Sequence, residues 1–127
     1  MKAILAVDEY RDMLSLYKTI FENSPHYKLD TRKPDEAVDL INKKRELRLY
    51  SLMIFDLDMP SQVPVEIIKK AYKANPKLKF LIHSGNSEKT KDIASKLKSE
   101  GIVAWRLGPF FKAEHLVELV EELIPEF

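Results

Sequence analysis

Residues 52–60, LMIFDLDMP, join an unbroken apolar run to a group of acids that follows it directly. The run Leu52–Phe55 is short and continuous rather than alternating, which is typical of a strand buried on both faces of a parallel sheet. Asp56 and Asp58 come immediately after it. The segment therefore predicts a buried strand that delivers carboxylates to its carboxyl end.

The same pattern recurs along the chain. Ala3–Val7 (AILAV), Phe80–Ile82 (FLI) and Ile102–Trp105 (IVAW) are further continuous apolar runs. Tyr27–Thr31 (YKLDT) alternates and carries charge, which suits a strand at the edge of a sheet. We therefore expect five strands, one of them at an edge.

Amphipathic segments with the i, i+3, i+4 spacing of helical faces separate these runs. The second is expected to begin near Lys33-Pro34-Asp35, the third to end at Asn75-Pro76 and the fourth to close at Gly101. The five faces comprise Met13–Phe21, Ala37–Lys44, Ile67–Tyr72, Ile93–Leu97 and Leu116–Leu123, the last reaching Ile124.

Five alternating strand-helix units predict an α/β fold, an open doubly wound parallel sheet with helices on both faces. A length of 127 residues with 45% apolar residues suits one domain with a real core. We expect this single domain to span residues 1–127 without an output domain. In such sheets ligands bind beyond the carboxyl ends of the strands.

Composition excludes several classes of function. The chain has no cysteine, so disulfides and thiolate chemistry are excluded. Its net charge of +1 gives no electrostatic reason to bind nucleic acid or membrane directly. The apolar run Ala3–Val7 is too short for a signal peptide or a membrane span. We therefore expect a cytoplasmic location.

The strand ends collect acids. Asp8 and Glu9 follow the first run and Asp56 follows the third, so neighbouring strands would deliver three carboxylates to one small volume. Crowded carboxylates repel one another unless a cation compensates. Mg²⁺ prefers such oxygen ligands, and we expect it here. The alternative is that these acids are solvated loop residues.

These residues carry a resemblance over essentially the whole chain to the receiver domain of bacterial response regulators, of the chemotaxis-type single-domain kind. Residues 4–9 (ILAVDE) are similar to the family's acidic pair, and residues 55–60 (FDLDMP) to its phosphoacceptor strand and Met-Pro loop. Ser84-Gly85 falls where the family has a hydroxyl residue and a small one. The resemblance implies a flavodoxin-like (βα)5 sheet of strand order 2-1-3-4-5.

The resemblance also implies roles for individual residues. Asp56 would accept a phosphoryl group from a histidine kinase or phosphotransfer protein. Glu9, Asp56 and the backbone carbonyl of Asp58 would bind Mg²⁺ directly, with Asp8 acting through water. Ser84 would sense the phosphoryl oxygens, and Trp105 would be the switch aromatic. A separate downstream protein would read the change, and any enzymatic activity would be limited to self-phosphorylation and autodephosphorylation.

Gly108 is the main departure from the family pattern. Gly108-Pro109-Phe110 falls where the family has Lys-Pro-Phe, so the cation beside the acceptor is missing. Arg106 or Lys112 could replace it. The bond before Pro109 is a candidate cis peptide, as in the family.

Three other positions depart more mildly. Glu9 is longer than the family's usual aspartate, Asp58 adds an acid at a position that influences attack by water on the phosphoryl bond, and Val63-Pro64 replaces the family's Asp-Gly before the third helix. The departures leave three outcomes open: a working receiver, a metal-binding receiver with weak phosphorylation, or a pseudo-receiver that acts as an interaction module.

The sequence supports two further interpretations. Residues 54–58 and 82–86 also resemble motifs of haloacid-dehalogenase-type phosphatases, with Asp56 as nucleophile and Asp58 as general acid. Two preceding strand-helix units and the lack of acids in residues 102–110 disfavour this reading.

The second interpretation is docking of two copies through the fourth helix, fifth strand and fifth helix. Lysines in residues 69–98 and glutamates in residues 114–122 favour it; solvated helix faces are the alternative. The histidines, His26, His83 and His115, lack metal-ligand spacing and are interpreted as structural.

Overall fold

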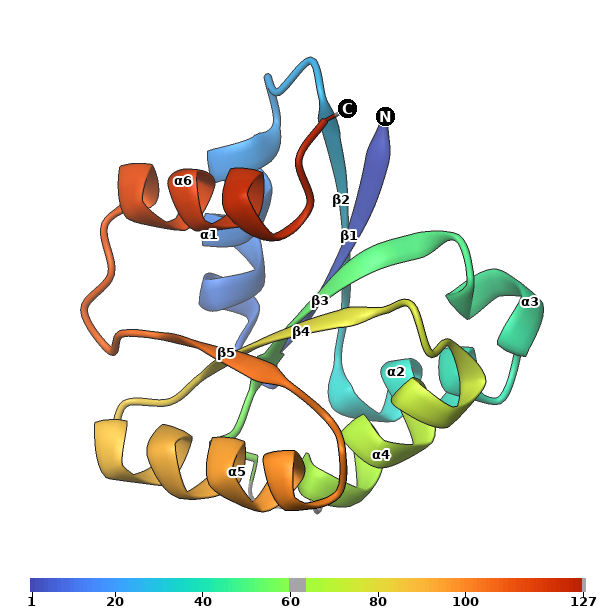
Figure 1. Cartoon of the computed structure of the whole chain (residues 1–127). Coiled ribbons are helices and arrows are strands. Elements are labelled where there is room, and N and C mark those ends of the chain that lie inside the picture. The colour runs from blue at the N-terminus through green and yellow to red at the C-terminus, as the bar shows by residue number, and fades with distance from the viewer. Residues whose placement is uncertain (60–63, 127) are drawn as a thin grey trace.

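The computed structural model describes residues 1–59 and 64–126 (Figure 1). The elements alternate in the predicted order, with one short helix added. They are β1 (Lys2–Val7), α1 (Arg11–Phe21), β2 (Tyr27–Arg32), α2 (Pro34–Ile41), α3 (Lys44–Leu47), β3 (Tyr50–Asp56), α4 (Pro64–Ala74), β4 (Lys79–His83), α5 (Ser87–Ser99), β5 (Ala104–Leu107) and α6 (Ala113–Leu123).

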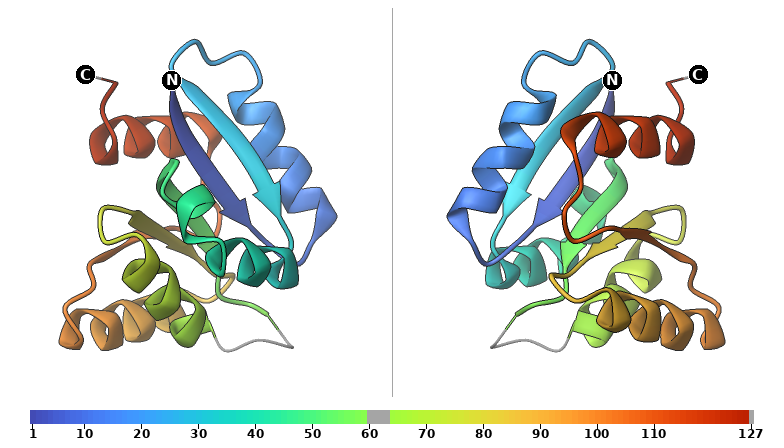
Figure 2. Two further views of the ribbon diagram at one scale, coloured as in Figure 1. Left: turned by 90° about the vertical axis from the view of Figure 1, so that its right-hand side faces the viewer. Right: turned by 90° about the vertical axis from the view of Figure 1, so that its left-hand side faces the viewer.

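The five strands form one parallel sheet in the order β2-β1-β3-β4-β5. Helices α1 and α6 cover one face of the sheet, and α2, α4 and α5 cover the other (Figures 1 and 2). The predicted flavodoxin-like doubly wound fold and its strand order are confirmed. So is the edge position of β2.

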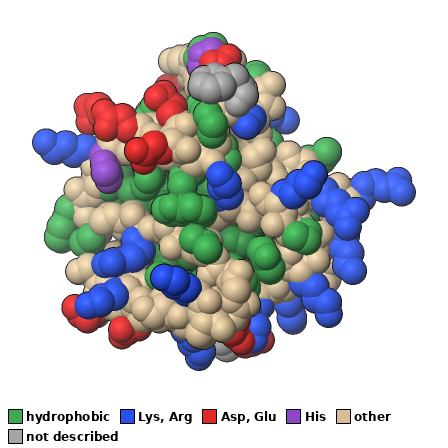
Figure 3. All heavy atoms as spheres, viewed as in Figure 1, with side chains coloured by type: hydrophobic (Ala, Val, Ile, Leu, Met, Phe, Trp, Pro, Cys, Tyr) green, Lys and Arg blue, Asp and Glu red, His purple; other side chains and the backbone are tan. Residues whose placement is uncertain are grey.

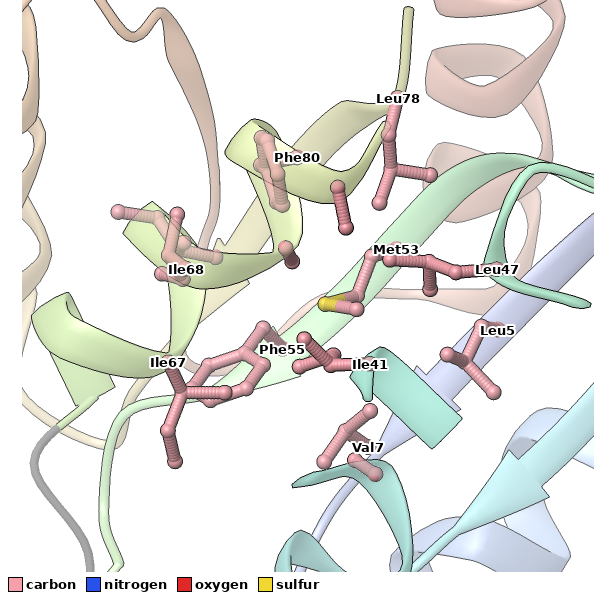
Figure 4. Close-up of a cluster of buried hydrophobic side chains, with 14 of the residues drawn as sticks. Leu5, Val7, Ile41, Leu47, Met53, Phe55, Ile67, Ile68, Leu78 and Phe80 are labelled. Atoms are coloured by element: carbon pink, nitrogen blue, oxygen red, sulfur yellow. The ribbon is translucent and has the colours of Figure 1, made fainter. Parts of the chain in front are cut away.

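The core has two layers because successive side chains of a strand point to opposite faces. Leu5, Val7, Met53 and Phe55 point towards α2, α4 and α5, where they pack with Ile68 (Figure 4). The residues between them point towards α1 and α6, among them Ile4, Ala6, Leu52 and Ile54. The continuous apolar runs of β1 and β3 are thus explained by burial on both faces.

Local signals explain where the helices begin and end. Pro34 opens α2, and the Lys33 N–H donates to the Glu36 carboxylate at 2.8 Å. Pro64 opens α4, in the first turn of a helix, where the missing N–H of proline has no helical partner to lose. Gly101 follows α5 with φ of 82°, a left-handed conformation that glycine adopts without strain.

The fifth strand lies two residues later than predicted. β5 covers Ala104–Leu107, whereas Ile102 stays buried in the turn and donates its N–H to the Leu97 carbonyl at 2.9 Å. An apolar residue just after a left-handed glycine commonly packs back on the helix it closes. The apolar character of Ile102 therefore belongs to the end of α5, and β5 is the second edge of the sheet, with Arg106 exposed.

The second helix is shorter than predicted. α2 ends at Ile41, and Lys44 belongs to the separate helix α3. The connection is fixed by Asn75, which is 4% exposed and whose side-chain amide donates to the carbonyls of Leu47 and Tyr50, each at 3.1 Å. Leu47 is fully buried. A separate turn is needed to bring this leucine into the core before β3 begins.

The described residues contain no cis peptide bond, so the cis prediction at Pro109 is wrong; trans remains the lower-energy form even before proline. Pro60 and Val63 lie outside the described residues, so the predictions for the Met-Pro loop and for Val63-Pro64 are not tested there. Within residues 1–59 and 64–126, no helix has the length and apolar character needed to cross a bilayer.

The buried centre of the sheet predicts a strong effect of truncation at Leu5, which is 0% exposed. We expect Leu5→Ala to lower the free energy of unfolding by about 2.5–5 kcal/mol, because it removes apolar contacts and leaves a cavity. Leu49→Ala is the matched control, since Leu49 is 73% exposed. It should change stability by less than about 0.5 kcal/mol. Urea denaturation measures both, and equal losses would contradict the assigned core.

Candidate functional site

The register of three central strands brings the predicted acids together. Val7 of β1 pairs with Phe55 of β3, and Asp56 of β3 pairs with His83 of β4. Asp8 follows Val7 directly, so Asp8, Asp56 and His83 lie in a row at the carboxyl edge of the sheet. The two-residue period of strands puts Asp56 and His83 on the face covered by α1 and α6.

Asp8 is almost completely buried, with 1% of its surface exposed. Its Oδ1 accepts a hydrogen bond of 2.8 Å from the Tyr10 N–H, just before α1 begins. Burial raises the pKa of Asp8 from 3.8 to about 6, against the Tyr10 hydrogen bond, and the negative charges of Asp56, Asp58 and Glu9 add to the increase. The carboxylate is thus held in a place that disfavours its charge.

Asp56 is 5% exposed and ends β3. Its Oδ1 accepts a hydrogen bond of 3.1 Å from the Asp58 N–H. Its Oδ2 is buried and has no hydrogen-bond partner among the described residues, and the same holds for Glu9 Oε2. Burial also raises the pKa of Asp56 above its ordinary value. Two buried carboxylate oxygens therefore have no hydrogen-bond donor among the described residues.

The donor set fits Mg²⁺ in the form that keeps water ligands. Among the described residues no three His, Asp or Glu side chains stand in an arrangement that would hold a metal ion by themselves. Mg²⁺ is commonly bound by only one or two carboxylates and several waters. The unpartnered oxygens of Glu9 and Asp56, with Asp8 behind them, meet that requirement.

Asp58 uses its side chain in a way that the sequence analysis did not anticipate. Its carboxylate accepts hydrogen bonds from the Ser84 hydroxyl at 2.9 and 3.0 Å and from the Gly85 N–H at 2.8 Å. Lys89 Nζ lies 3.1 Å from Asp58 Oδ1 in an ion pair. Burial by itself would raise the pKa of Asp58, but these three partners together lower it below its ordinary value. The proposed metal role of its backbone carbonyl stays a prediction.

Ser84 lies at the end of β4 and is 0% exposed. Its Oγ accepts a hydrogen bond of 3.0 Å from the Asn86 N–H while the hydroxyl donates to Asp58. Asn86 in turn caps α5, because its side chain accepts from the N–H groups of Glu88 and Lys89. The predicted sensing residue is therefore fixed between the third strand and the start of α5.

The missing lysine is not replaced by either neighbour considered from the sequence. Arg106 turns to α5, where it donates to Thr90 Oγ1 at 3.3 Å and to the Ser87 carbonyl at 3.5 Å. Lys112 is exposed at the start of α6. Gly108 is exposed, and a Cβ built on it would meet nothing within 4 Å. The position thus has room for a longer side chain.

Of the two phenylalanines that follow Pro109, only the second packs inward. Phe110, expected to match the family's Phe, is 95% exposed. Phe111 packs inward instead: its ring stacks on Tyr17 at 6.1 Å and meets His83 edge-on at 5.4 Å. His83 was interpreted as structural, yet it pairs with Asp56, and its positive charge would lower the pKa of that acid. The position of His83 directly after the apolar run Phe80–Ile82, like that of Asp56 after Leu52–Phe55, is the signal in the sequence that places the two side by side.

Trp105 lies in β5, half-buried, on the face covered by α1 and α6. It pairs with Leu81, two residues before His83, so it lies back along the sheet from the row of acids. Lys79 Nζ lies 5.8 Å from the centre of its ring. The proposed movement of Trp105 stays a prediction.

Known proteins resemble this chain in three-dimensional structure, whereas the sequence comparisons found no match. No family model matches the sequence, and no curated protein matches it. A receiver domain protein from Clostridium thermocellum superposes with a TM-score of 0.81 at 20% identity, covering 98% of this chain and 94% of that one. A CheY-like receiver domain protein from Methanospirillum hungatei gives 0.79 at 23% identity, covering 96% and 92%.

A third relative carries ligands. The response regulator TrrA from Thermotoga maritima, solved in complex with Mg²⁺ and BeF, superposes with a TM-score of 0.74 at 26% identity. The match covers 98% of this chain and 100% of that one. The chain has the receiver fold of response regulators. Its Asp56 ends the third strand of that receiver sheet, and its Asp8 follows the first.

The raised pKa of Asp8 predicts a particular dependence of stability on pH. The folded receiver binds a proton on Asp8 more readily than the unfolded chain, so Asp8 destabilises the fold progressively as pH rises from about 4 to about 6 and remains destabilising above it. We expect Asp8→Asn, which keeps the acceptor for the Tyr10 N–H, to raise the free energy of unfolding at neutral pH by about 1–2 kcal/mol. Urea denaturation at pH 4 and pH 7 measures this gain.

The control for this prediction is Asp12→Asn, an exposed acid in the first turn of α1. It should show no comparable gain between the two pH values. The Mg²⁺-dependent rise in melting temperature should be smaller in Asp8→Asn than in the unaltered chain. A stability gain that is the same at pH 4 and pH 7 would contradict a buried, strained carboxylate.

Proposed function

We propose that this chain accepts a phosphoryl group on Asp56 with the help of Mg²⁺ and thereby changes its binding to a separate protein. The observation that carries the proposal is the position of Asp56: it ends the central strand of a receiver sheet with one buried oxygen, Oδ2, free of partners among the described residues. The donor would be a histidine kinase or a phosphotransfer protein. The proposal also includes action in the cytoplasm.

The chemistry uses the carboxylate as a nucleophile. An Asp56 oxygen would attack phosphorus, a bond from that oxygen to phosphorus would form, and the bond from phosphorus to the donor's histidine nitrogen or acetate oxygen would break. The leaving group would keep the electron pair. Bound Mg²⁺ supplies neutralisation of negative charge on the transferring group. The residues of this chain align the acceptor, since the Asp58 N–H fixes one oxygen of Asp56 and leaves the other.

A receiver must also sense the new charge. Ser84 and the Gly85 N–H are donors at the adjacent strand end, and both already contact a carboxylate, that of Asp58. Donors that satisfy a carboxylate can also satisfy phosphoryl oxygens. A rearrangement of the β4–α5 connection on phosphorylation is therefore part of the proposal, as is the movement of Trp105.

The surface formed by α5, β5 and α6 is the proposed site of partner binding or of docking between two copies. Figure 3 shows acidic side chains gathered over α6 and Lys and Arg side chains over α5 and towards α3. The acidic residues exposed on α6 are Glu114, Glu118, Glu121 and Glu122. Opposite charge on two parts of one face favours head-to-tail contact between protein surfaces.

A second candidate function is a receiver that binds partners without being phosphorylated. It is favoured by one observation, that the cation expected beside Asp56 is absent at Gly108 while Asp58 already occupies the donors of Ser84 and Gly85. In this case the domain would present a fixed surface, and loss of Asp56 would not alter partner binding. The phosphatase alternative stays a minor hypothesis, and hydrolysis of a generic phosphate ester that is lost in Asp58→Ala would support it.

The primary proposal is tested with acetyl phosphate and Mg²⁺. We expect the intact mass to rise by one phosphoryl group in the unaltered chain and not in Asp56→Asn, because an amide is not a competent acceptor. The control is Asp39→Asn, an exposed acid on α2 that should be modified normally. No modification of the folded, unaltered chain would leave the phosphorylation-independent module as the function.

Gly108→Lys provides a second test. Because a side chain at this position has open space, we expect the variant to fold normally and to accept the phosphoryl group at least about ten-fold faster, by supplying charge to the transition state. Ala113→Lys, exposed at the start of α6, adds the same charge away from the acceptor and should leave the rate unchanged. Equal rates in the two variants would contradict a specific effect of positive charge at position 108.

A further inference from the structure

Three donors from two neighbouring parts of the fold converge on the carboxylate of Asp58. Ser84 Oγ lies at the end of β4, the Gly85 N–H lies in the connection that follows, and Lys89 Nζ comes from the first turn of α5. Their distances to the carboxylate oxygens are 2.8–3.1 Å. A neutral hydroxyl, a backbone N–H and an ammonium group together form the kind of donor set that binds a phosphate-type anion.

The place of Lys89 in its helix is unusual. Asn86 caps α5, which makes Lys89 the third residue of the helix. Acidic residues are favoured there and cations are disfavoured, because the helix dipole is positive at this end. The carboxylate of Asp58 supplies the negative charge that a lysine in this place requires. The ion pair with Asp58 therefore offsets the unfavourable position of Lys89 at the positive end of the α5 dipole.

The donors lie directly beside the proposed acceptor. Asp58 is two residues from Asp56, and its N–H donates to Asp56 Oδ1 at 3.1 Å. The charge of Lys89 reaches Asp56 as well, since it acts to lower the pKa of that acid. A phosphoryl group on Asp56 would therefore enter the space next to Ser84, Gly85 and Lys89.

We infer that Ser84, Gly85 and Lys89 form a phosphate-binding site whose internal occupant, the carboxylate of Asp58, is displaced by an incoming phosphoryl group. Lys89 supplies the cation that Gly108 does not. The role in phosphoryl transfer rests on the proposed function, whereas the anion site does not. In the resting protein Asp58 competes with the anion, so the site is open to an external ligand only when this side chain turns away.

The geometry permits such an exchange without unfolding. The side chains of Asp58 and Lys89 are 40% and 42% exposed, so solvent reaches the ion pair. Gly85 leaves space over the carboxylate, as a Cβ there would come no closer than 3.8 Å to Asp58 Oδ2. Ser84 stays anchored to the Asn86 N–H while its hydroxyl changes acceptor. Only the side chain of Asp58 has to rotate.

The first experiment tests the anion site apart from phosphoryl transfer. The ¹⁵N-labelled full chain and Asp58→Ala are titrated with inorganic phosphate without Mg²⁺, and the Gly85 amide resonance is followed. We expect saturable binding at least about ten-fold tighter in Asp58→Ala than in the unaltered chain. The apparent affinity of the unaltered chain is reduced in proportion to the fraction of molecules in which Asp58 leaves the site open. Asp58→Asn serves as a second variant with nearly the same shape and no charge.

Lys89→Met and Lys91→Met in the Asp58→Ala background form the matched pair. Both remove one lysine from α5, but Lys91 is exposed and makes no contact with Asp58 among the described residues. We expect Lys89→Met to weaken phosphate binding about ten-fold and Lys91→Met to leave it unchanged. An equal effect of the two lysines, or no saturable shift of Gly85 in either uncharged Asp58 variant, would overturn the anion site.

The second experiment measures the rate of modification by acetyl phosphate and Mg²⁺. A faster rate in Asp58→Ala, reduced again by Lys89→Met, supports displacement of Asp58 by the phosphoryl group. An equal or slower rate in Asp58→Ala overturns that competition. If no variant is modified while Asp58→Ala still binds inorganic phosphate, the proposed function fails and the anion site remains.

Discussion

β3 is paired with parallel strands on both sides over Leu52–Phe55, and this pairing decides where the polar groups of the site lie. Hydrogen bonds fix β1 and β4 against it, so Asp56 stands beside His83 and one step beyond Val7. Adjacent strands are only about 4.8 Å apart, so carboxylates at their ends cannot avoid one another. The apolar layers on both faces make any change of register expensive. Burial and mutual repulsion of Asp8 and Asp56 follow directly from this arrangement.

The surplus of negative charge at this edge explains most of the local contacts. Asp8 is stabilised by one backbone N–H, Asp56 by another, and Asp58 by Ser84, Gly85 and Lys89. Lys89 neutralises part of this negative charge through its ion pair with Asp58. Arg106 does not, because its side chain bonds to Thr90 of α5. The donors Ser84, Gly85 and Lys89 could bind a negatively charged ligand, but the carboxylate of Asp58 occupies them in this structure. This combination accounts for both candidate functions.

The contacts around β5 connect the site to the opposite end of the sheet. Phe111 lies between Tyr17 and His83, so the connection into α6 touches the row of polar residues. Farther along, Lys79 contacts the ring of Trp105 and donates to the Leu123 carbonyl at 2.6 Å, at the end of α6. Residues of this sheet face therefore contact Phe111, in the connection before α6, and the carbonyl of Leu123 at the end of α6.

The alternation of strands and helices and the doubly wound sheet could be predicted from the chain, because apolar runs and helical spacing are local patterns. The collection of Asp8, Glu9 and Asp56 at one edge could be predicted too, because parallel strands share an edge. The prediction placed β5 two residues too early, because Ile102 is apolar to close α5 and does not belong to the strand. It missed α3, because Leu47 is apolar to fill the core and does not extend α2. The partners of Asp58, the inward packing of Phe111 and the hydrogen bonds of Arg106 to α5 became known from the three-dimensional structure. Those outcomes depend on which side chains meet across the fold, and residues as distant in sequence as Asp58 and Lys89 leave no local pattern that announces their contact.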